Sequence, residues 1–129
     1  MPPTKPLAER MHLRAGERLL LVNAPDGYGS RLAAPDSVEI ANTPQGTFDV
    51  IQVFVTTRAA LEAESPRLKA LLKPDGKLWF TYPKGTSTRL TADINRDDIR
   101  RYALTLGLQT VAQVAVDDDW SAIRCKVVA

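Results

Sequence analysis

Two polar stretches carry the side chains that could do chemistry, and each follows a segment with the pattern of a buried strand. "NAPDGYG" (residues 23–29) offers an amide, a carboxylate and a phenol that can hydrogen-bond a small polar ligand. "KGTST" (residues 84–88) offers an ammonium group and hydroxyls, which suit a phosphate or carboxylate. We therefore predict a ligand-binding site formed by Asn23, Asp26, Gly27, Tyr28, Lys84, Thr86 and Ser87.

The alternative is that both stretches are ordinary turns. Gly, Asn, Asp and Ser are the residues that turns require, each for a conformational or hydrogen-bonding reason of its own. Pro25 would fix a rigid turn directly after the strand, and "DGYG" would supply a second, flexible one. The sequence leaves both interpretations open.

Other chemistries have weaker signals. "DDDW" (residues 117–120) could offer carboxylates to a hard cation, but three adjacent aspartates cannot all point one way. We expect a hairpin turn there, with Trp120 covering the end of the core, and leave open that Asp117 faces a ligand. Cys125 alternates with Ile123 and Val127 as a small buried hydrophobe, and no histidine lies near it in sequence. We therefore predict neither a catalytic residue nor a metal site.

The bulk properties are those of one globular domain. The chain has 129 residues, of which 44% are hydrophobic and 25% charged. The net charge is only +2, and the basic group Arg96, Arg100 and Arg101 falls on a helix surface, which disfavours a nucleic-acid partner. No apolar run approaches the roughly 20 residues of a membrane span, and "MPPTKPLAER" lacks the apolar stretch of a signal peptide. We expect a cytoplasmic protein without a membrane segment.

The elements that position the two loops predict an α/β fold. Residues 1–6 predict a disordered or extended lead-in, and residues 7–129 a single domain. Apolar runs predict strands at 19–24, 37–41, 48–56, 110–116 and 121–128, with another after a turn at Pro74–Gly76. Helices are predicted at 7–13, at 56–72 with a break at Ser65–Pro66, and at 95–107, where Asn95 can cap the helix. The last two strands must form an antiparallel hairpin, because "DDDW" is too short for a parallel crossover.

Several stretches resemble the class I methyltransferases that use S-adenosylmethionine. "LRAGERLLLV" is similar to their entry turn and first strand, and "FDVIQVFVT" to their fourth strand. "LLKPDGKLWF" is similar to the turn before their fifth strand, and "DDDWSAIRCKV" to their closing hairpin. The resemblance implies a three-layer Rossmann-like domain, with a mostly parallel sheet closed by a C-terminal antiparallel hairpin. "NAPDGY", "YPKG" and "DDDWSAIR" also look like a group of small bacterial proteins with no assigned function.

The sequence departs from the methyltransferase pattern where the cofactor would bind. The family's first strand ends in an acidic residue and glycines, whereas this one ends in Asn23, Ala24 and Pro25, and proline has no N–H to offer. The family's ribose-binding carboxylate is replaced by Ala41–Asn42. The short chain also leaves no room for the third strand, and the next helix is missing or reduced. The resemblance therefore implies a degenerate cofactor site, with S-adenosylmethionine disfavoured.

Two functions follow as expectations. The first is a non-catalytic small-molecule-binding or regulatory module that takes a small anionic ligand, with a thinly covered sheet surface suited to self-association or a protein partner. The alternative is a minimal S-adenosylmethionine-dependent methyltransferase, holding the cofactor through Asn23, Asp26 and Tyr28, or another anion-handling transferase that uses Lys84.

Overall fold

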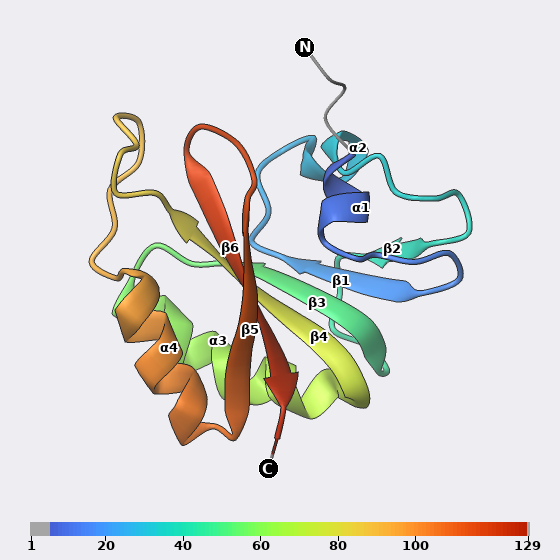
Figure 1. Cartoon of the computed structure of the whole chain (residues 1–129). Helices are drawn as coiled ribbons and strands as arrows, with labels where there is room; N and C mark the ends of the chain where they lie inside the picture. The colour runs from blue at the N-terminus through green and yellow to red at the C-terminus, as the bar shows by residue number, and fades with distance from the viewer. Residues whose placement is uncertain (1–5, 129) are drawn as a thin grey trace.

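A single six-stranded sheet runs through the computed structural model, which describes residues 6–128 (Figure 1). The predicted lead-in over residues 1–6 lies outside the described residues, apart from Pro6. The strands, in the spatial order β2-β1-β3-β4-β6-β5, are β2 (Glu39–Ala41), β1 (Arg18–Val22), β3 (Phe48–Phe54), β4 (Leu72–Pro83), β6 (Trp120–Val127) and β5 (Leu108–Ala115). The first four are mutually parallel, and β6 and β5 are added antiparallel. This confirms the predicted sheet and its closing hairpin.

Helices cover both faces of the sheet, which gives three layers. On one face lie α1 (Leu7–Arg10) and α2 (Tyr28–Arg31), and on the other α3 (Arg58–Leu71) and α4 (Arg96–Thr105) (Figure 1). Strands buried on both faces become almost continuously apolar. Accordingly β3 sends Ile51 and Val53 into the core under α3 and α4, and Val50 and Phe54 into the core under α1 and α2.

The predicted break in the long helix is wrong, because α3 runs through Pro66 without interruption. Proline removes the N–H that would bond the carbonyl of Glu62, four residues back. The hydroxyl of Tyr102, on α4, donates to that carbonyl at 3.3 Å. A neighbouring helix therefore supplies the hydrogen bond that the proline cannot make, and the helix tolerates Pro66.

The predicted turn at Pro74–Gly76 lies inside β4 as an irregularity. Phe48 pairs with Leu72 while Val50 pairs with Lys77, so β4 has extra residues between these two pairs. Gly76 is needed there, since a Cβ atom would lie 2.7 Å from Cγ of Leu72 and 3.0 Å from the carbonyl oxygen of Asp49. The glycine permits a close approach of β4 to β3.

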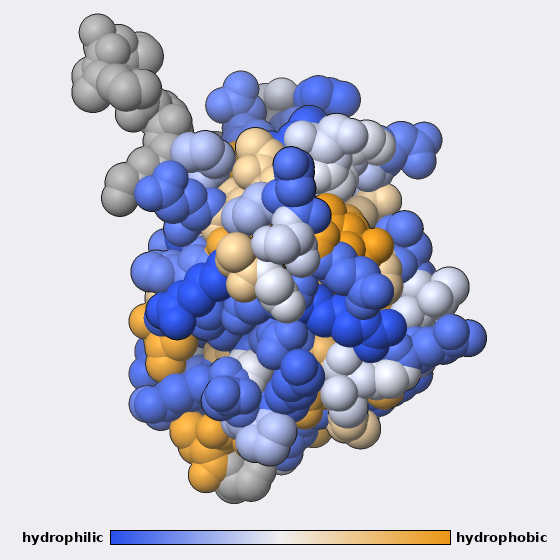
Figure 2. All heavy atoms as spheres, turned by 90° about the vertical axis from the view of Figure 1, so that its right-hand side faces the viewer, coloured by the Kyte–Doolittle hydropathy of each residue, from blue (hydrophilic) through white to orange (hydrophobic). Residues whose placement is uncertain are grey.

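The connection from β2 to β3 contains neither a helix nor a strand. Residues 42–47 make this link, and Arg18 at the start of β1 fixes it by donating to the carbonyl of Thr47 at 2.9 Å. The guanidinium of Arg18 also pairs with Glu39 and lies 4.3 Å from the ring centre of Phe48. The side of the molecule near β2 is mostly hydrophilic, with small, separate hydrophobic areas (Figure 2).

The structure of α4 confirms the predicted helix and its cap at Asn95. Asn95 accepts from the backbone N–H of Asp98 at 2.9 Å, and the carboxylate of Asp98 accepts from the N–H of Asn95 at 3.1 Å. This reciprocal capping satisfies two free donors at the helix start. Ile99 and Ala103 are fully buried against the sheet. None of the helices among residues 6–128 is long and apolar enough to cross a membrane.

Candidate functional site

The predicted site residues lie on two loops at the end of the sheet where the parallel strands terminate. One loop follows β1 and leads into the first residues of α2 (residues 23–29), and the other follows β4 and contains residues 84–90. Because β1, β3 and β4 are parallel neighbours, their carboxyl ends lie together at this end of the sheet, where ligands bind in open α/β sheets. The two loops differ in how their side chains are used.

The loop after β1 is anchored in the core by Tyr28, which is 1% exposed. Its ring packs edge-on against Phe54 with centroids 4.8 Å apart. Its hydroxyl donates to Oε1 of Gln52 at 2.9 Å, and Nε2 of Gln52 donates to Oγ1 of Thr81 at 2.9 Å. Burial raises the pKa of Tyr28 to about 12, although the hydrogen bond with Gln52 opposes the rise. The hydroxyl therefore belongs to a buried chain and does not face a ligand, in contrast to its predicted role.

The other predicted groups of this loop face solvent. Asn23 adopts a left-handed conformation with φ 59°, which asparagine tolerates better than most residues, and Gly27 has φ 78°. The N–H of Tyr28 donates to the carbonyl of Pro25 at 3.1 Å, which closes the turn. The side chains of Asn23 and Asp26 form no hydrogen bond or ion pair within the described part of the chain. They are therefore free to contact a ligand, and their role in binding stays a prediction.

The loop after β4 is fixed through its backbone and Ser87. The hydroxyl of Ser87 donates to Oδ1 of Asp119 at 2.9 Å and accepts from the N–H of Leu90 at 3.1 Å. The N–H of Lys84 donates to the carbonyl of Asp119 at 2.8 Å. Ser87 thus shapes the loop, while Lys84, Gly85 and Thr86 line an open hollow.

This hollow has a volume of about 510 Å³ and is also lined by Tyr82, Gln113 and Ser121. Gln113 organises its floor, because its Nε2 donates to the Tyr82 hydroxyl and to Oγ of Ser121, both at 3.1 Å. The hollow therefore presents an ammonium group beside hydroxyl and amide groups, which suits a small anion. The sequence prediction missed Tyr82, Gln113 and Ser121, although a glutamine inside the apolar run "TVAQVAV" was a usable signal.

The predicted hairpin turn contacts both α2 and the loop after β4. Oδ1 of Asp117 accepts from the N–H groups of Asp119 and Trp120, both at 2.8 Å, and Oδ2 forms an ion pair with Arg31 at 3.0 Å. Trp120 packs edge-on against Phe54 with centroids 5.0 Å apart, at the end of the core as expected. Asp117 binds the α2 side and Asp119 the Lys84 side, so this turn links the loops. No three His, Cys, Asp or Glu side chains gather to hold a metal among residues 6–128.

The remaining nucleophile candidate is inside the core. Cys125 is fully buried, and burial raises the pKa of its thiol to about 12. A thiol with that pKa is protonated at neutral pH and is a poor nucleophile. His12, the single histidine, is exposed on the segment after α1, where its carbonyl accepts from Lys77 at 3.0 Å.

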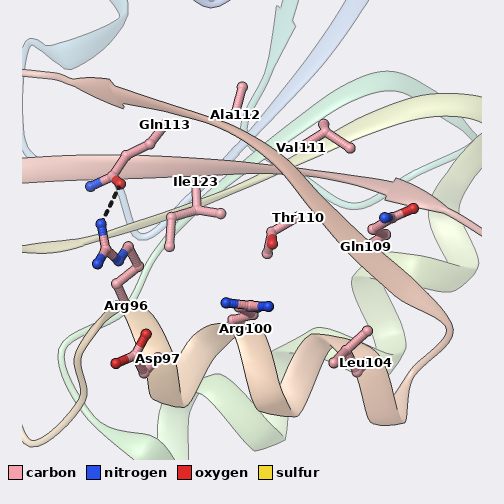
Figure 3. Close-up of a pocket in the computed structure, with 10 residues that line it drawn as sticks. All are labelled: Arg96, Asp97, Arg100, Leu104, Gln109, Thr110, Val111, Ala112, Gln113 and Ile123. Carbon is pink, nitrogen blue, oxygen red and sulfur yellow. Dashed lines mark hydrogen bonds between the residues drawn. The ribbon is translucent and has the colours of Figure 1, made fainter.

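A second hollow, not predicted from the sequence, lies between α4 and β5 (Figure 3). It is a groove of about 490 Å³ whose helix side carries Arg96, Arg100 and Leu104. The two arginines point toward β5, and Thr110 and Ile123 point down toward them from the sheet. Nη1 of Arg96 donates to Oε1 of Gln113 at 3.4 Å, so Gln113 joins the two hollows.

The fold is that of the class I, Rossmann-like methyltransferases. A SAM-dependent methyltransferase from Aquifex aeolicus is 12% identical and superposes with a TM-score of 0.67, over 93% of this chain and 87% of its own. The ribosomal protein L11 methylase from Lactobacillus delbrueckii is 14% identical, with a TM-score of 0.62 over 94% and 74%. The 1,6-didemethyltoxoflavin-N1-methyltransferase from Burkholderia thailandensis, solved with S-adenosylhomocysteine, is 12% identical, with 0.62 over 95% and 75%.

Sequence comparison adds no closer assignment. No protein-family model matches the chain, and no curated protein does. At these identities the structural likeness defines the fold alone. The resemblance to a group of small bacterial proteins stays a prediction.

Proposed function

We propose that this protein is a methyltransferase-fold binding module that does not hold S-adenosylmethionine in the manner of its structural relatives. Its ligand is a small anion, bound in the hollow beside Lys84. The observation that carries the proposal is the contrast between a core-anchored loop after β1 and an open, cationic hollow after β4. A cytoplasmic location is part of the proposal.

The groups that a Rossmann-like site uses do not fit the cofactor here. Such a site brings backbone N–H groups close to its ligand through glycines after the first strand. Here Pro25 has no N–H, and the N–H of Tyr28 is used within the turn. The carboxylate of β2, Glu39, lies at the start of that strand and is paired with Arg18. The tip of β2 carries Ala41 and then Asn42, so no carboxylate stands ready there for ribose hydroxyls.

The hollow beside Lys84 supports the second half of the proposal. Lys84 forms no ion pair within residues 6–128, and its backbone is held by Asp119. Thr86, Ser121 and the Gln113–Tyr82 pair surround it with groups that can orient a phosphate or carboxylate. A fixed backbone beneath a free cation reduces the ordering cost of binding an anion.

The competing function is a minimal methyltransferase, or another anion-handling transferase. The likeness to methyltransferases supports it, as do the solvent-facing Asn23 and Asp26 beyond β1, where the fold's ligands bind. Under this function the cofactor would be held by Asn23 and Asp26, without Tyr28. The two functions predict opposite responses to S-adenosylmethionine.

Thermal unfolding separates them. A ligand at a hundred times its Kd adds about 2.7 kcal/mol, which for a domain of this size raises Tm by roughly ten degrees. We expect no rise with millimolar S-adenosylmethionine or S-adenosylhomocysteine. We expect a rise with pyrophosphate that Lys84→Ala removes and the control Lys126→Ala keeps. Lys126 is exposed and lies on β6, outside the hollow.

The two parts of the proposal, the lack of S-adenosylmethionine binding and the anion site beside Lys84, can be disproved separately. A rise of about ten degrees with S-adenosylmethionine would replace the proposal with the methyltransferase function. A pyrophosphate response equal in wild type and Lys84→Ala would remove the hollow as the anion site.

A further inference from the structure

The two edges of the sheet differ in their protection against pairing with another strand. Natural edge strands are kept short, charged or interrupted by proline, because their free N–H and C=O groups otherwise recruit new strands. The β2 edge has three residues including Glu39, and Pro44 follows shortly after. The β5 edge has eight residues, "LQTVAQVA", with neither a charge nor a proline. Its one protective feature is a bulge at Val111, which has no partner on β6.

The β5 edge also has a groove beside it. Arg96 and Arg100 stand on the groove's helix side and point toward the strand (Figure 3). The side chain of Arg100 forms no hydrogen bond or ion pair with the described residues, and that of Arg96 has only the contact with Gln113. Asp97, at the rim, is the one acidic residue that lines the groove. The groove therefore carries a net positive charge that the described residues leave unpaired.

Exposed apolar side chains lie at the same place. Leu104 on α4 and Val111 on β5 are 58% and 40% exposed, and they are two of the three large hydrophobic residues exposed in residues 6–128. A strand added to β5 would cover part of both, because they line the groove on its helix and strand sides. Apolar and cationic groups thus flank one free edge.

We propose that β5 pairs with an extended, acidic segment of a partner protein. The segment adds a seventh strand to the sheet through main-chain hydrogen bonds to β5. Its alternate side chains enter the groove, where carboxylates meet Arg96 and Arg100 and an apolar side chain meets Leu104. This inference goes beyond the proposed anion site and concerns a different surface, with Gln113 as the residue that both share.

Charge favours this occupant over a second copy of the chain. A two-fold pairing of β5 with β5 would place both α4 helices on the same face of one continuous sheet. Four arginines, two from each copy, would then face two aspartates along the joint. An acidic segment instead gives each arginine a partner. The geometry and the charge together point to a different protein.

An NMR titration tests the pairing with a synthetic nine-residue peptide that alternates Glu and Val. We expect amide shift changes concentrated on β5, and a Kd at least tenfold weaker for the double variant Arg96→Glu/Arg100→Glu. The control Arg14→Glu changes an exposed arginine near α1, on the other face of the sheet, and should keep the wild-type Kd within about twofold. The same peptide with alternate backbone nitrogens methylated should not bind, since it cannot add to the ladder.

Three results would overturn the proposal. The first is an absence of shifts on β5 at millimolar peptide. The second is equal binding of the methylated peptide or of a peptide with Lys in place of Glu. The third is a concentration-dependent dimer, seen by sedimentation, that Val111→Pro dissociates, because a second copy would then occupy the edge.

Discussion

The loops after β1 and after β4 begin at the carboxyl ends of two strands of one sheet and use their polar residues in opposite ways. The first turns its phenol into the core, where Tyr28, Gln52 and Thr81 form a hydrogen-bonded chain between α2, β3 and β4. The second binds its own backbone through Ser87 and Asp119, and leaves Lys84 and Thr86 around a hollow. One loop contributes its side chain to the core, and the other keeps its side chains for solvent or a ligand.

The position of a loop in a fold therefore does not assign it a role. The loop after the first strand is the usual ligand site of Rossmann-like sheets, yet here it contains a residue that the core requires. Substitutions in the two loops separate a structural role after β1 from a free one after β4.

The largest effect is expected for Tyr28→Ala. Removing a buried aromatic ring that packs on Phe54 should lower the free energy of unfolding by about 3 to 5 kcal/mol. Tyr28→Phe keeps the ring but leaves Oε1 of Gln52 without its donor, and should cost about 1 to 3 kcal/mol. Urea unfolding followed by circular dichroism measures both. If Tyr28→Ala cost less than about 1 kcal/mol, the loop after β1 would not be anchored by its ring.

The second effect appears at alkaline pH. The pKa of Tyr28 is about 12 in the folded protein and near 10 when unfolded, so between these values only the folded state holds the proton. Stability that is fully present below pH 10 should therefore be lost as the pH rises toward 12, by on the order of 2 to 3 kcal/mol.

Comparing wild type with Tyr28→Phe isolates this contribution, because Cys125, whose pKa is also raised, is present in both. The unfolding free energy of wild type should fall more steeply with pH than that of the variant. Parallel curves would show that the phenol of Tyr28 ionises in the folded state as it does in water.

The sequence predicted the sheet well because strand patterns are local. The apolar run in β3, the capping residues of α4 and the short link before Trp120 each depend on a few neighbouring residues. The break at Pro66 was wrong because the hydroxyl that replaces its missing hydrogen bond comes from Tyr102, 36 residues away in sequence. No local pattern reports a partner that far along the chain.

The site was harder to predict for the same reason. Asn23, Asp26, Lys84 and Thr86 lie on exposed loops, where turn residues and ligand residues have the same composition. Tyr28 reads as a loop residue, and only the packing of α2 on the sheet turns its hydroxyl to Gln52. The groove beside β5 joins a helix surface to a strand edge, and both looked ordinary when taken separately.

The smallest changes in stability are expected for substitutions in the loop after β4, where two residues can be compared. Ser87→Ala removes a donor to Asp119 and an acceptor for two backbone N–H groups, and should cost about 1 kcal/mol, or roughly four degrees in Tm. Lys84→Ala removes a partly exposed side chain without an ion pair among residues 6–128, and should change stability by less than about 0.5 kcal/mol. Asp26→Ala, in the loop after β1, should be equally mild, because its carboxylate faces solvent.

Together these three variants show which loop residues stabilise the fold and which are free to bind a ligand. If Ser87→Ala is costly and Lys84→Ala is neutral, the loop has a structural residue beside a free one, and a loss of pyrophosphate binding in Lys84→Ala reports on binding alone. A cost above about 1 kcal/mol for Lys84→Ala would make that lysine part of the fold. The contrast with Tyr28 would then disappear, because the side chains of both loops would contribute to the stability of the fold.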